Sequence, residues 1–227
     1  PLMLRRPVRA PHHTASSPAI IGGGTIPKPG EVTLAHHGVL FLDELPEFDR
    51  DVLETLRQPL EDGAVTVARA HAAIRFPARF MLVTALNPTA KGSHVPGDAM
   101  SQRAMDHYLS RLSEPLIDRI DIHVEVPAVR YRELTGPARG TTSEQIRSRV
   151  AEAHRRQHAR QARISNAALG RRELDRVAKL DSESARLMEQ AMTELGLSAR
   201  AYDKVRRVAR TIADLEGDAD VKSHHVA

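Results

Sequence analysis

The sequence has 227 residues, 41% hydrophobic and 27% charged, which is typical of a globular protein and excludes a chain that is disordered throughout. It contains no cysteine, which excludes disulfides and thiolate metal sites, and no apolar run long enough to span a bilayer. The net charge of +4 permits a polyanionic partner without requiring one. The first residues lack the layout of a signal peptide, so we expect a cytoplasmic protein with no membrane partner.

The first part of the chain alternates short apolar runs with helical stretches, a pattern that favours a parallel α/β sheet. Residues 39–42 and 81–85 are the clearest buried strands. Residues 121–126 alternate between polar and apolar and then meet Pro127, so we expect a third, edge-like strand there. Two β-prone runs around a short turn predict a hairpin over 64–76.

Residues 130–142 contain Gly136, Pro137 and Gly140 and show no helical or strand pattern of apolar residues, so we place a domain boundary there. The expected organisation is therefore an α/β domain over 1–135 and a small all-α domain over 143–227. Three polar residues are predicted to cap helices of the second domain, and one glycine is predicted to end a helix: Thr142, Asp181, Ser198 and Gly196.

Polar side chains follow both clear strands. Asp43 and Glu44 come directly after the first strand, and Asn87 follows the second. Because ligands of open α/β sheets bind beyond the carboxyl ends of strands, one carboxylate can hold a hydrated Mg²⁺ while its neighbour orients a water molecule. Taken alone, the acidic pair can also be a strand exit that caps the next helix, and Asn before Pro is also a turn signal. Their combination predicts a phosphoryl-transfer site.

Six segments together resemble the magnesium-chelatase-like ComM/YifB family of AAA+ ATPases, and they extend over nearly the whole chain. They are residues 9–14 (Arg-Ala-Pro-His-His-Thr), 38–44, 57–63 (Arg-Gln-Pro-Leu-Glu-Asp-Gly), 118–121 (Asp-Arg-Ile-Asp), 197–202 and 209–215.

This resemblance implies an AAA+ parallel-sheet core followed by a helical lid, in a ring that is expected to be a hexamer and to use ATP and Mg²⁺. By the same resemblance, Asp43 and Glu44 form the Walker B pair, with Asp43 binding Mg²⁺ through water. Asn87 corresponds to sensor 1, Arg119 to the arginine finger, and Arg200 to the nucleotide-binding sensor 2.

The two arginines also have simpler interpretations. Arg119 lies between Asp118 and Asp121, so it can form a salt bridge within its own chain. Arg200 falls in the first turn of its helix, where a cation gains nothing from the helix dipole, and this slightly favours a role with an anion. A guanidinium suits that role because it keeps its charge and presents a planar fork to phosphate.

Two features depart from the family. No Gly-x-x-x-x-Gly-Lys-Ser/Thr occurs, and the glycines at 22–24 have neither its spacing nor a following helix. We therefore expect a partial core that lacks the P-loop strand and helix, belongs to a longer protein, and is inactive alone. Many family members carry cysteines after the sensor 1 Asn-Pro, whereas this chain has only His94 there, so we expect no zinc and a surface loop residue.

DNA is the expected partner of the full-length protein. In related helicase-like rings, the hairpin before sensor 1 and an insertion corresponding to residues 14–29 face the central pore. Lys28, Arg69 and His71 are then candidates for phosphate contacts, although an ordinary edge hairpin with solvated charges would look the same. Two alternatives remain: a chelatase-like ATPase that remodels a protein partner, and a non-catalytic interaction module without a P-loop.

Overall fold

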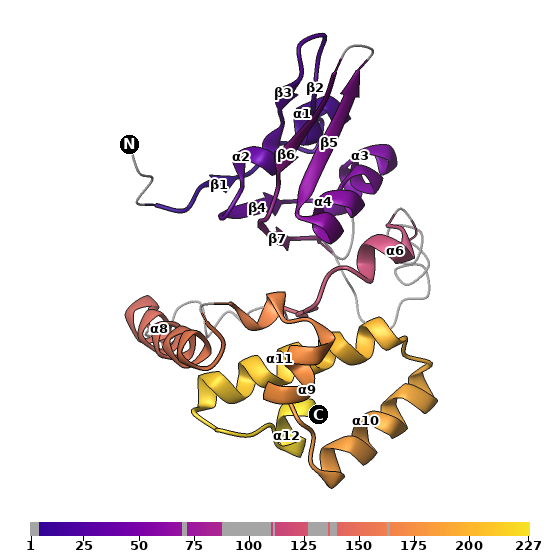
Figure 1. Cartoon of the computed structure of the whole chain (residues 1–227). Helices are drawn as coiled ribbons and strands as arrows, with labels where there is room; N and C mark the ends of the chain where they lie inside the picture. The colour runs from indigo at the N-terminus through magenta and orange to yellow at the C-terminus, as the bar shows by residue number, and fades with distance from the viewer. Residues whose placement is uncertain are drawn as a thin grey trace. The chain divides into compact units, whose positions relative to one another are not determined.

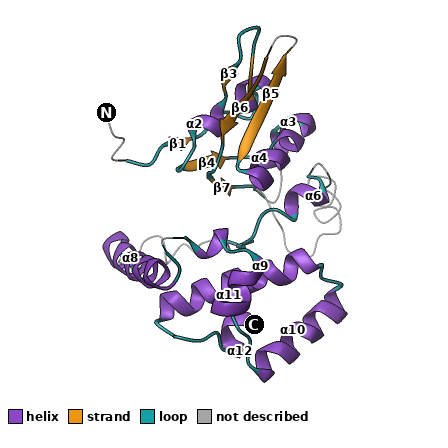
Figure 2. Cartoon of the chain, viewed as in Figure 1, coloured by secondary structure: helices purple, strands orange, loops and turns teal. Residues whose placement is uncertain are grey.

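The computed structural model describes residues 5–69, 72–87, 110, 112–126, 136, 140–162 and 164–227, and within these ranges the side chains of Arg69 and Ala72 are not described. The chain forms two compact units, Pro1–Ile120 and Asp121–Ala227. The strands lie in the first unit, and the second is built of helices (Figures 1 and 2). The boundary predicted over 130–142 falls mostly outside the described residues and stays a prediction, as does the place of His94.

The first unit alternates strands and short helices, as the sequence predicts. Its described elements, in chain order, are β1 (Val8–Arg9), α1 (Ser17–Ile21), β2 (Gly22–Gly23), β3 (Lys28–Pro29), α2 (Glu31–Leu34), β4 (Val39–Leu42), the 3₁₀ turn η1 (Leu45–Glu47), α3 (Arg50–Thr55), α4 (Arg57–Asp62), β5 (Ala64–Arg69), β6 (Ala72–Pro77), β7 (Met81–Thr84) and α6 (Glu114–Ile117).

A parallel three-stranded sheet organises this unit, in the order β1–β4–β7. The strands predicted over 39–42 and 81–85 are confirmed as β4 and β7, although β7 ends at Thr84 and, unlike β4, has no fully buried residue, so its predicted burial is wrong. The strand predicted over 121–126 is wrong, because these residues are exposed and form no strand. Alternation alone does not make a strand, since the backbone groups need a neighbouring strand to bond. The third strand is instead β1, which has only two residues.

One face of the sheet packs on the core. Leu40 and Leu42 of β4 are buried with side chains of α1, α2, α3 and the hairpin. On the other face, Met81 and Val83 of β7 are exposed. Because β4 is the middle strand and is buried on the core side, its carboxyl end is held firmly where Asp43 and Glu44 emerge.

Two antiparallel hairpins belong to the same unit. β5 pairs with β6 in register from Ala64↔Pro77 to Arg69↔Ala72, which confirms the hairpin predicted over 64–76. A shorter hairpin joins β2 to β3 through two pairs, with Gly22 at φ 102° in a conformation that favours glycine. The two hairpins extend in the same direction in Figure 1.

The second unit is helical, and the predicted caps are confirmed. Thr142 forms a capping box with Gln145, Asp181 and Ser198 each accept a backbone hydrogen bond, and Gly196 ends its helix at φ 62°. The described elements are α8 (Ser143–Arg160), the 3₁₀ turn η2 (Asn166–Ala168), α9 (Arg171–Val177), α10 (Ser182–Leu195), α11 (Ala199–Glu216) and α12 (Ser223–Val226).

A polar network supports the core of the helical unit. Asp214 of α11 is fully enclosed and accepts hydrogen bonds from Arg160 (2.6 Å), Arg210 (3.0 Å) and Asn166 (2.8 Å), which tie α8 and η2 to α11. Leu169 and Leu174 pack beside it on Ala209 and Val221. In the described part of the chain, every helix is too short or too polar to cross a membrane.

Candidate active site

The carboxyl end of β4 presents two exposed carboxylates. Asp43 and Glu44 follow the strand directly, and the chain then turns away through η1, where Leu45 and Pro46 are buried. The backbone N–H of Glu44 donates to Oδ1 of Asp43 at 2.9 Å, which orients the first carboxylate. Because both side chains are exposed at a sheet edge, they are free to meet a ligand from solvent.

Glu44 has a left-handed backbone, with φ 52° and ψ 47°. Few residues other than glycine adopt this conformation, and it costs free energy for a residue with a Cβ. Leu42 before this pair of acids and the Leu45–Pro46 turn after it are buried, and they hold the backbone of Glu44 in this conformation.

Backbone hydrogen bonds hold the end of β7 beside the end of β4. The N–H of Ala85 donates to the carbonyl of Leu42 at 3.0 Å, and the N–H of Leu45 donates to the carbonyl of Ala85 at 3.0 Å. These two bonds continue the ladder beyond both strands. Asn87 follows two residues after Ala85 and is exposed, so its amide belongs to the same edge of the sheet as the carboxylates.

The structure adds a residue to this edge for which the sequence predicted no role. His13 Nδ1 lies 3.3 Å from Glu44 Oε2. The ring is held between His12, at 4.0 Å between centroids, and the edge of Phe48, at 6.4 Å. The signal was available, because His13 follows β1 and therefore lies at the same carboxyl edge.

Arg119 makes a different contact from those considered in the sequence. Its Nη2 donates to Glu61 of α4 at 2.5 Å, and its Nη1 donates to the carbonyl of Pro115 at 2.5 Å. Only 13% of the arginine side chain is exposed, whereas 49% of Glu61 is exposed. The Nε of Arg119 is buried without a hydrogen-bond partner in the described residues.

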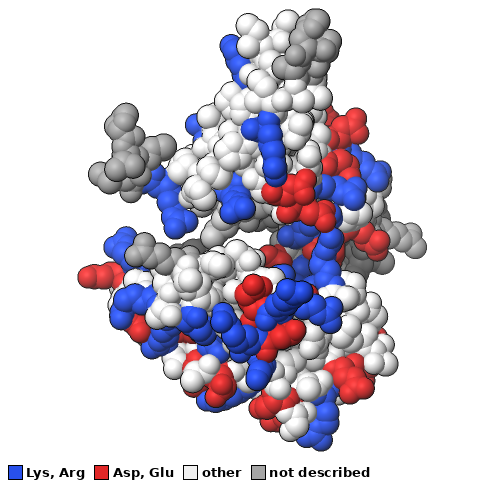
Figure 3. All heavy atoms as spheres, viewed as in Figure 1, with Lys and Arg blue, Asp and Glu red and all other residues white. Residues whose placement is uncertain are grey.

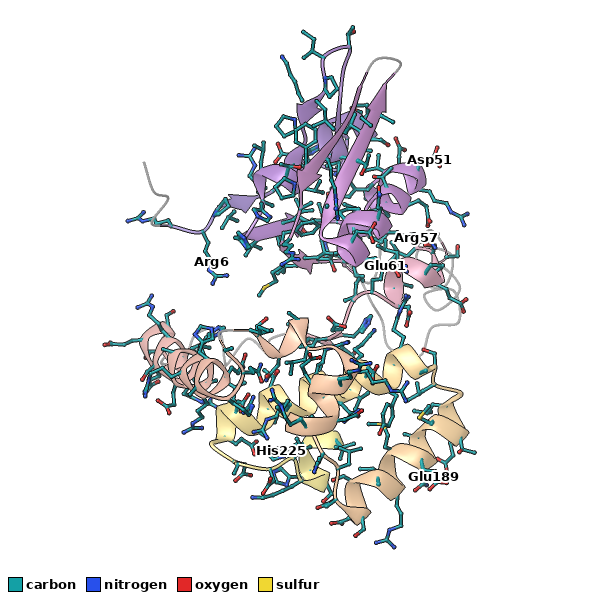
Figure 4. All side chains as sticks on the ribbon, viewed as in Figure 1. Arg6, Asp51, Arg57, Glu61, Glu189 and His225 are labelled. Atoms are coloured by element: carbon teal, nitrogen blue, oxygen red, sulfur yellow. The ribbon has the colours of Figure 1, made fainter. Side chains whose placement is uncertain are left out.

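An open groove surrounds this pair. The groove is lined by Glu54 of α3, by Arg57 and Glu61 of α4, and by Arg119, which lies two residues after α6 (Figure 4 labels Arg57 and Glu61). Arg57 is itself paired with Glu54 at 3.0 Å. A hydrogen bond from Ser113, followed by one from Arg57, holds the pKa of Glu54 below its ordinary value. The groove thus holds two arginines, each next to a carboxylate.

The remaining predicted site residues are placed less completely. Arg200 lies exposed in the first turn of α11, in the helical unit. Lys28 begins β3 and is exposed. Arg69 ends β5, but its side chain is outside the described residues, as is the whole of His71. The roles predicted for these four residues remain proposals.

A cluster of Glu216, Asp218, His224 and His225 in the helical unit has the composition of a metal site (Figure 4 labels His225). His225 argues against that function. Its Nδ1 accepts the backbone N–H of Lys222 at 2.9 Å, so the neutral ring carries its proton on Nε2 and donates it to Glu216 at 3.1 Å. A metal would need that nitrogen without its proton. Hydrogen bonds from His224 and then His225 hold the pKa of Glu216 below its ordinary value. We interpret the cluster as a tie between α12 and the end of α11.

Comparison with known proteins bears on both units. The family model for magnesium chelatase subunit ChlI matches residues 1–134, and the model for the C-terminal part of that subunit matches 140–227. Competence protein ComM of Haemophilus influenzae is 50% identical over 98% of this chain, and YifB of Salmonella typhimurium is 44% identical over 98%. The magnesium-chelatase subunit ChlI of Cyanophora paradoxa is 28% identical over 86%.

The chain spans 44% of the length of the ComM and YifB relatives and 50% of the ChlI relative. Both units are matched, and the mixed α/β unit followed by helices is consistent with a partial AAA+ core and its lid. The resemblance predicted from the six segments is therefore confirmed, and the chain belongs to the magnesium-chelatase-like AAA+ family, in its ComM/YifB branch.

Proposed function

We propose that this chain carries the hydrolytic edge and the lid of an oligomeric AAA+ ATPase that remodels or translocates on DNA. The observation that supports it most is the Asp43–Glu44 exit from the middle strand, fastened through Leu45 and Ala85 to the exit that carries Asn87. Exposed carboxylates and an amide form a hard oxygen donor set, which suits Mg²⁺ and phosphate-bound water.

We propose a role for each residue of this edge, supported by its position at the carboxyl ends of the strands. Asp43 holds Mg²⁺ through water, and Glu44 orients the water that attacks the γ-phosphate. His13 contacts Glu44 and fixes where its carboxylate points. Asn87 contacts the γ-phosphate or the attacking water. Bound ATP would supply the phosphoryl group, and its Mg²⁺ would neutralise the negative charge that develops on that group.

The two arginines complete the proposal. Arg119 is the finger that reaches the γ-phosphate held by a neighbouring subunit of a ring, which we take to be a hexamer. Arg200 of the lid contacts the nucleotide as sensor 2. A guanidinium suits both roles because its charge persists at every relevant pH and its fork matches phosphate. Lys28, Arg69 and His71 remain proposed contacts to DNA phosphates.

Replacing Glu44 tests the hydrolytic edge. In the full-length protein, Glu44→Gln should keep ATP bound while turnover falls about 10²- to 10⁴-fold, because the water loses its orienting carboxylate. Nucleotide binding and phosphate release are measured side by side. Glu47→Gln, three residues on in η1 and also exposed, is the matched control and should hydrolyse normally. Undiminished turnover in Glu44→Gln would show that the acidic exit only caps the following turn.

The relation to ChlI supports a second candidate, an ATPase that remodels a protein partner. Binding of the full-length protein to DNA at several salt concentrations separates the two candidates. Contacts to phosphates release counterions, so affinity for DNA should fall steeply as salt rises. Absence of DNA binding together with intact hydrolysis would favour the protein partner.

A further inference from the structure

The positive charge of the chain is concentrated in one stretch of the helical unit. Residues 155–179 contain eight Lys or Arg and two Asp or Glu, a net charge of +6. The whole chain carries +4, so the other residues sum to −2. On the face drawn in Figure 3, Lys and Arg side chains gather over the helical unit. The basic character of this protein therefore comes from the end of α8 and from α9.

The structure describes seven of these eight cations, all but Arg163, and divides the seven into two groups. On α8, Arg155 and Arg156 pair with Glu152, and Arg160 pairs with the buried Asp214, so these three guanidiniums serve the unit itself. The second group surrounds α9 and is exposed. Throughout the described chain, no side-chain hydrogen bond or ion pair engages its members, which are Arg171, Arg172, Arg176 and Lys179.

The α9 helix turns its apolar side inward and these cations outward. Leu174 is fully buried and packs with Val177 in the core of the unit. Arg172 and Arg176 are four residues apart and share the opposite face, since a helix repeats every 3.6 residues. Arg171 begins the helix beside Arg172, and Lys179 lies two residues beyond its end; both are exposed. We call these four exposed cations the α9 surface.

The acids of α9 do not neutralise this surface. Asp175 is held at 2.9 Å by Nη1 of Arg206, a buried guanidinium of α11 that also donates to the carbonyl of Ala178. The negative charge of Asp175 is thus neutralised by Arg206 and not by the exposed cations of α9. Glu173 is the other acidic residue in α9, so a clear excess of positive charge faces solvent.

We propose that the α9 surface binds the phosphodiester backbone of nucleic acid without regard to sequence. Guanidiniums present a fork that matches phosphate oxygens, and a row of unpaired cations gains affinity by releasing counterions. An acidic protein partner fits less well, because protein interfaces have an apolar centre and no large apolar side chain of α9 is exposed. The α9 helix also lacks an aromatic residue on which a base could stack. The inference rests on the DNA partner of the proposed function.

The test measures binding of the full-length protein to a labelled 30-nucleotide single strand of mixed sequence, from 50 to 300 mM salt. The variant replaces Arg171, Arg172 and Arg176 with Gln. If all three contact phosphates, the slope of log K against log salt should become shallower by about 2, and the affinity at 0.1 M salt should fall roughly 10- to 100-fold.

The matched control removes the same charge from other exposed positions of the helical unit, with Arg147, Arg149 and Arg186 replaced by Gln. Its slope should change by less than about half as much, because the overall field changes equally but no phosphate contact is lost. Replacing the three α9 arginines with Lys should keep most of the slope, and an unchanged melting temperature in all variants would show that the fold is intact.

Each other outcome has a distinct meaning. If the wild type binds DNA and the Gln variant of α9 matches its control, the α9 surface is not a contact and the DNA partner survives. If the wild type binds no DNA, the DNA partner itself is wrong. If the wild type binds poly-glutamate but not DNA, and the α9 variant loses that binding, the surface belongs to an acidic polypeptide and the proposal is overturned.

Discussion

Each unit holds an arginine against a carboxylate, in opposite surroundings. In the α/β unit, Arg119 meets Glu61, whose side chain is half exposed. In the helical unit, Arg210 and Asp214 are each only 1% exposed, and Arg160 adds a second guanidinium to the same carboxylate. A pair whose carboxylate is open to solvent is screened and can be exchanged for another anion, whereas breaking a pair whose carboxylate is fully buried leaves a charge without compensation. The first pair therefore suits a residue that must change partners, and the second suits a permanent support.

Removing Arg119 tests the first half of this comparison and should have the largest effect. In the full-length protein, Arg119→Ala should leave ATP binding nearly intact and lower hydrolysis about 10³-fold or more, as the loss of a finger does. Arg57→Ala, which removes another arginine from the same groove, is the control and should cost far less. Steady-state turnover and nucleotide binding are the measurements.

Mixing Arg119→Ala subunits with Glu44→Gln subunits sharpens the result. A mixed ring contains some interfaces at which an intact Glu44 faces an intact Arg119, so part of the activity should return. If Arg119→Ala lowers the melting temperature of its own subunit and mixing restores nothing, Arg119 is a structural residue like Arg210, provided that both variants assemble.

Breaking the buried pair should destabilise the fold. Asp214→Asn removes the carboxylate from two guanidiniums and should cost about 3–5 kcal/mol of unfolding free energy, measured by denaturant titration. Glu152→Gln, which loosens exposed pairs with Arg155 and Arg156, should cost less than about 1 kcal/mol. Equal losses in the two variants would remove the distinction between exposed and buried pairs.

The same carboxylate gives the stability a pH dependence of known sign. Burial by itself would raise the pKa of Asp214, but hydrogen bonds from Arg160 and Asn166 and the charge of Arg210 outweigh it, so the pKa lies below its ordinary value. The stabilisation is therefore fully present above the unfolded pKa of about 3.9 and is lost as the pH falls through the lower folded value. Asp214→Asn should lack this part of the acid-induced loss.

The smallest effect is expected at Glu61. Glu61→Gln removes the charge that competes with phosphate for Arg119, so turnover of the full-length protein should rise about 1.4- to 5-fold, the range that corresponds to an exposed pair worth 0.2–1 kcal/mol. Initial rates at saturating ATP are compared with those of the wild type. A fall as large as that of Arg119→Ala would show that Glu61 positions the arginine, and the two pairs would then act alike.

The sequence predicts the structure best where local chemistry decides it. Helix caps at Thr142, Asp181 and Ser198 depend only on a side chain and a backbone group three residues away, so they can be predicted from the local sequence. The strands β4 and β7 are predicted equally well, because each is a short apolar run rich in β-prone residues and ends at polar or turn-forming residues. In these places the pattern and the fold depend on the same few residues.

Long-range pairing accounts for what the sequence did not predict. Residues 121–126 alternate like a strand but form none, and β1 is a strand of two residues that shows no pattern. The contacts of His13 with Glu44 and of Arg119 with Glu61 join residues 31 and 58 positions apart. Their partners depend on how the sheet and α4 are placed, which no local pattern encodes. The roles of these residues in catalysis remain predictions.

At Glu44, the left-handed backbone lowers the stability of the fold, while the side chain carries the carboxylate that the proposed function needs. A side chain in this conformation costs about 1–3 kcal/mol, so the fold is less stable than it would be with glycine there. Substitutions selected for thermal stability would favour glycine at position 44, since it adopts the conformation without strain, and would delete the carboxylate at the same time. A stabilised version of this protein should therefore be sought elsewhere in the chain, with position 44 held fixed.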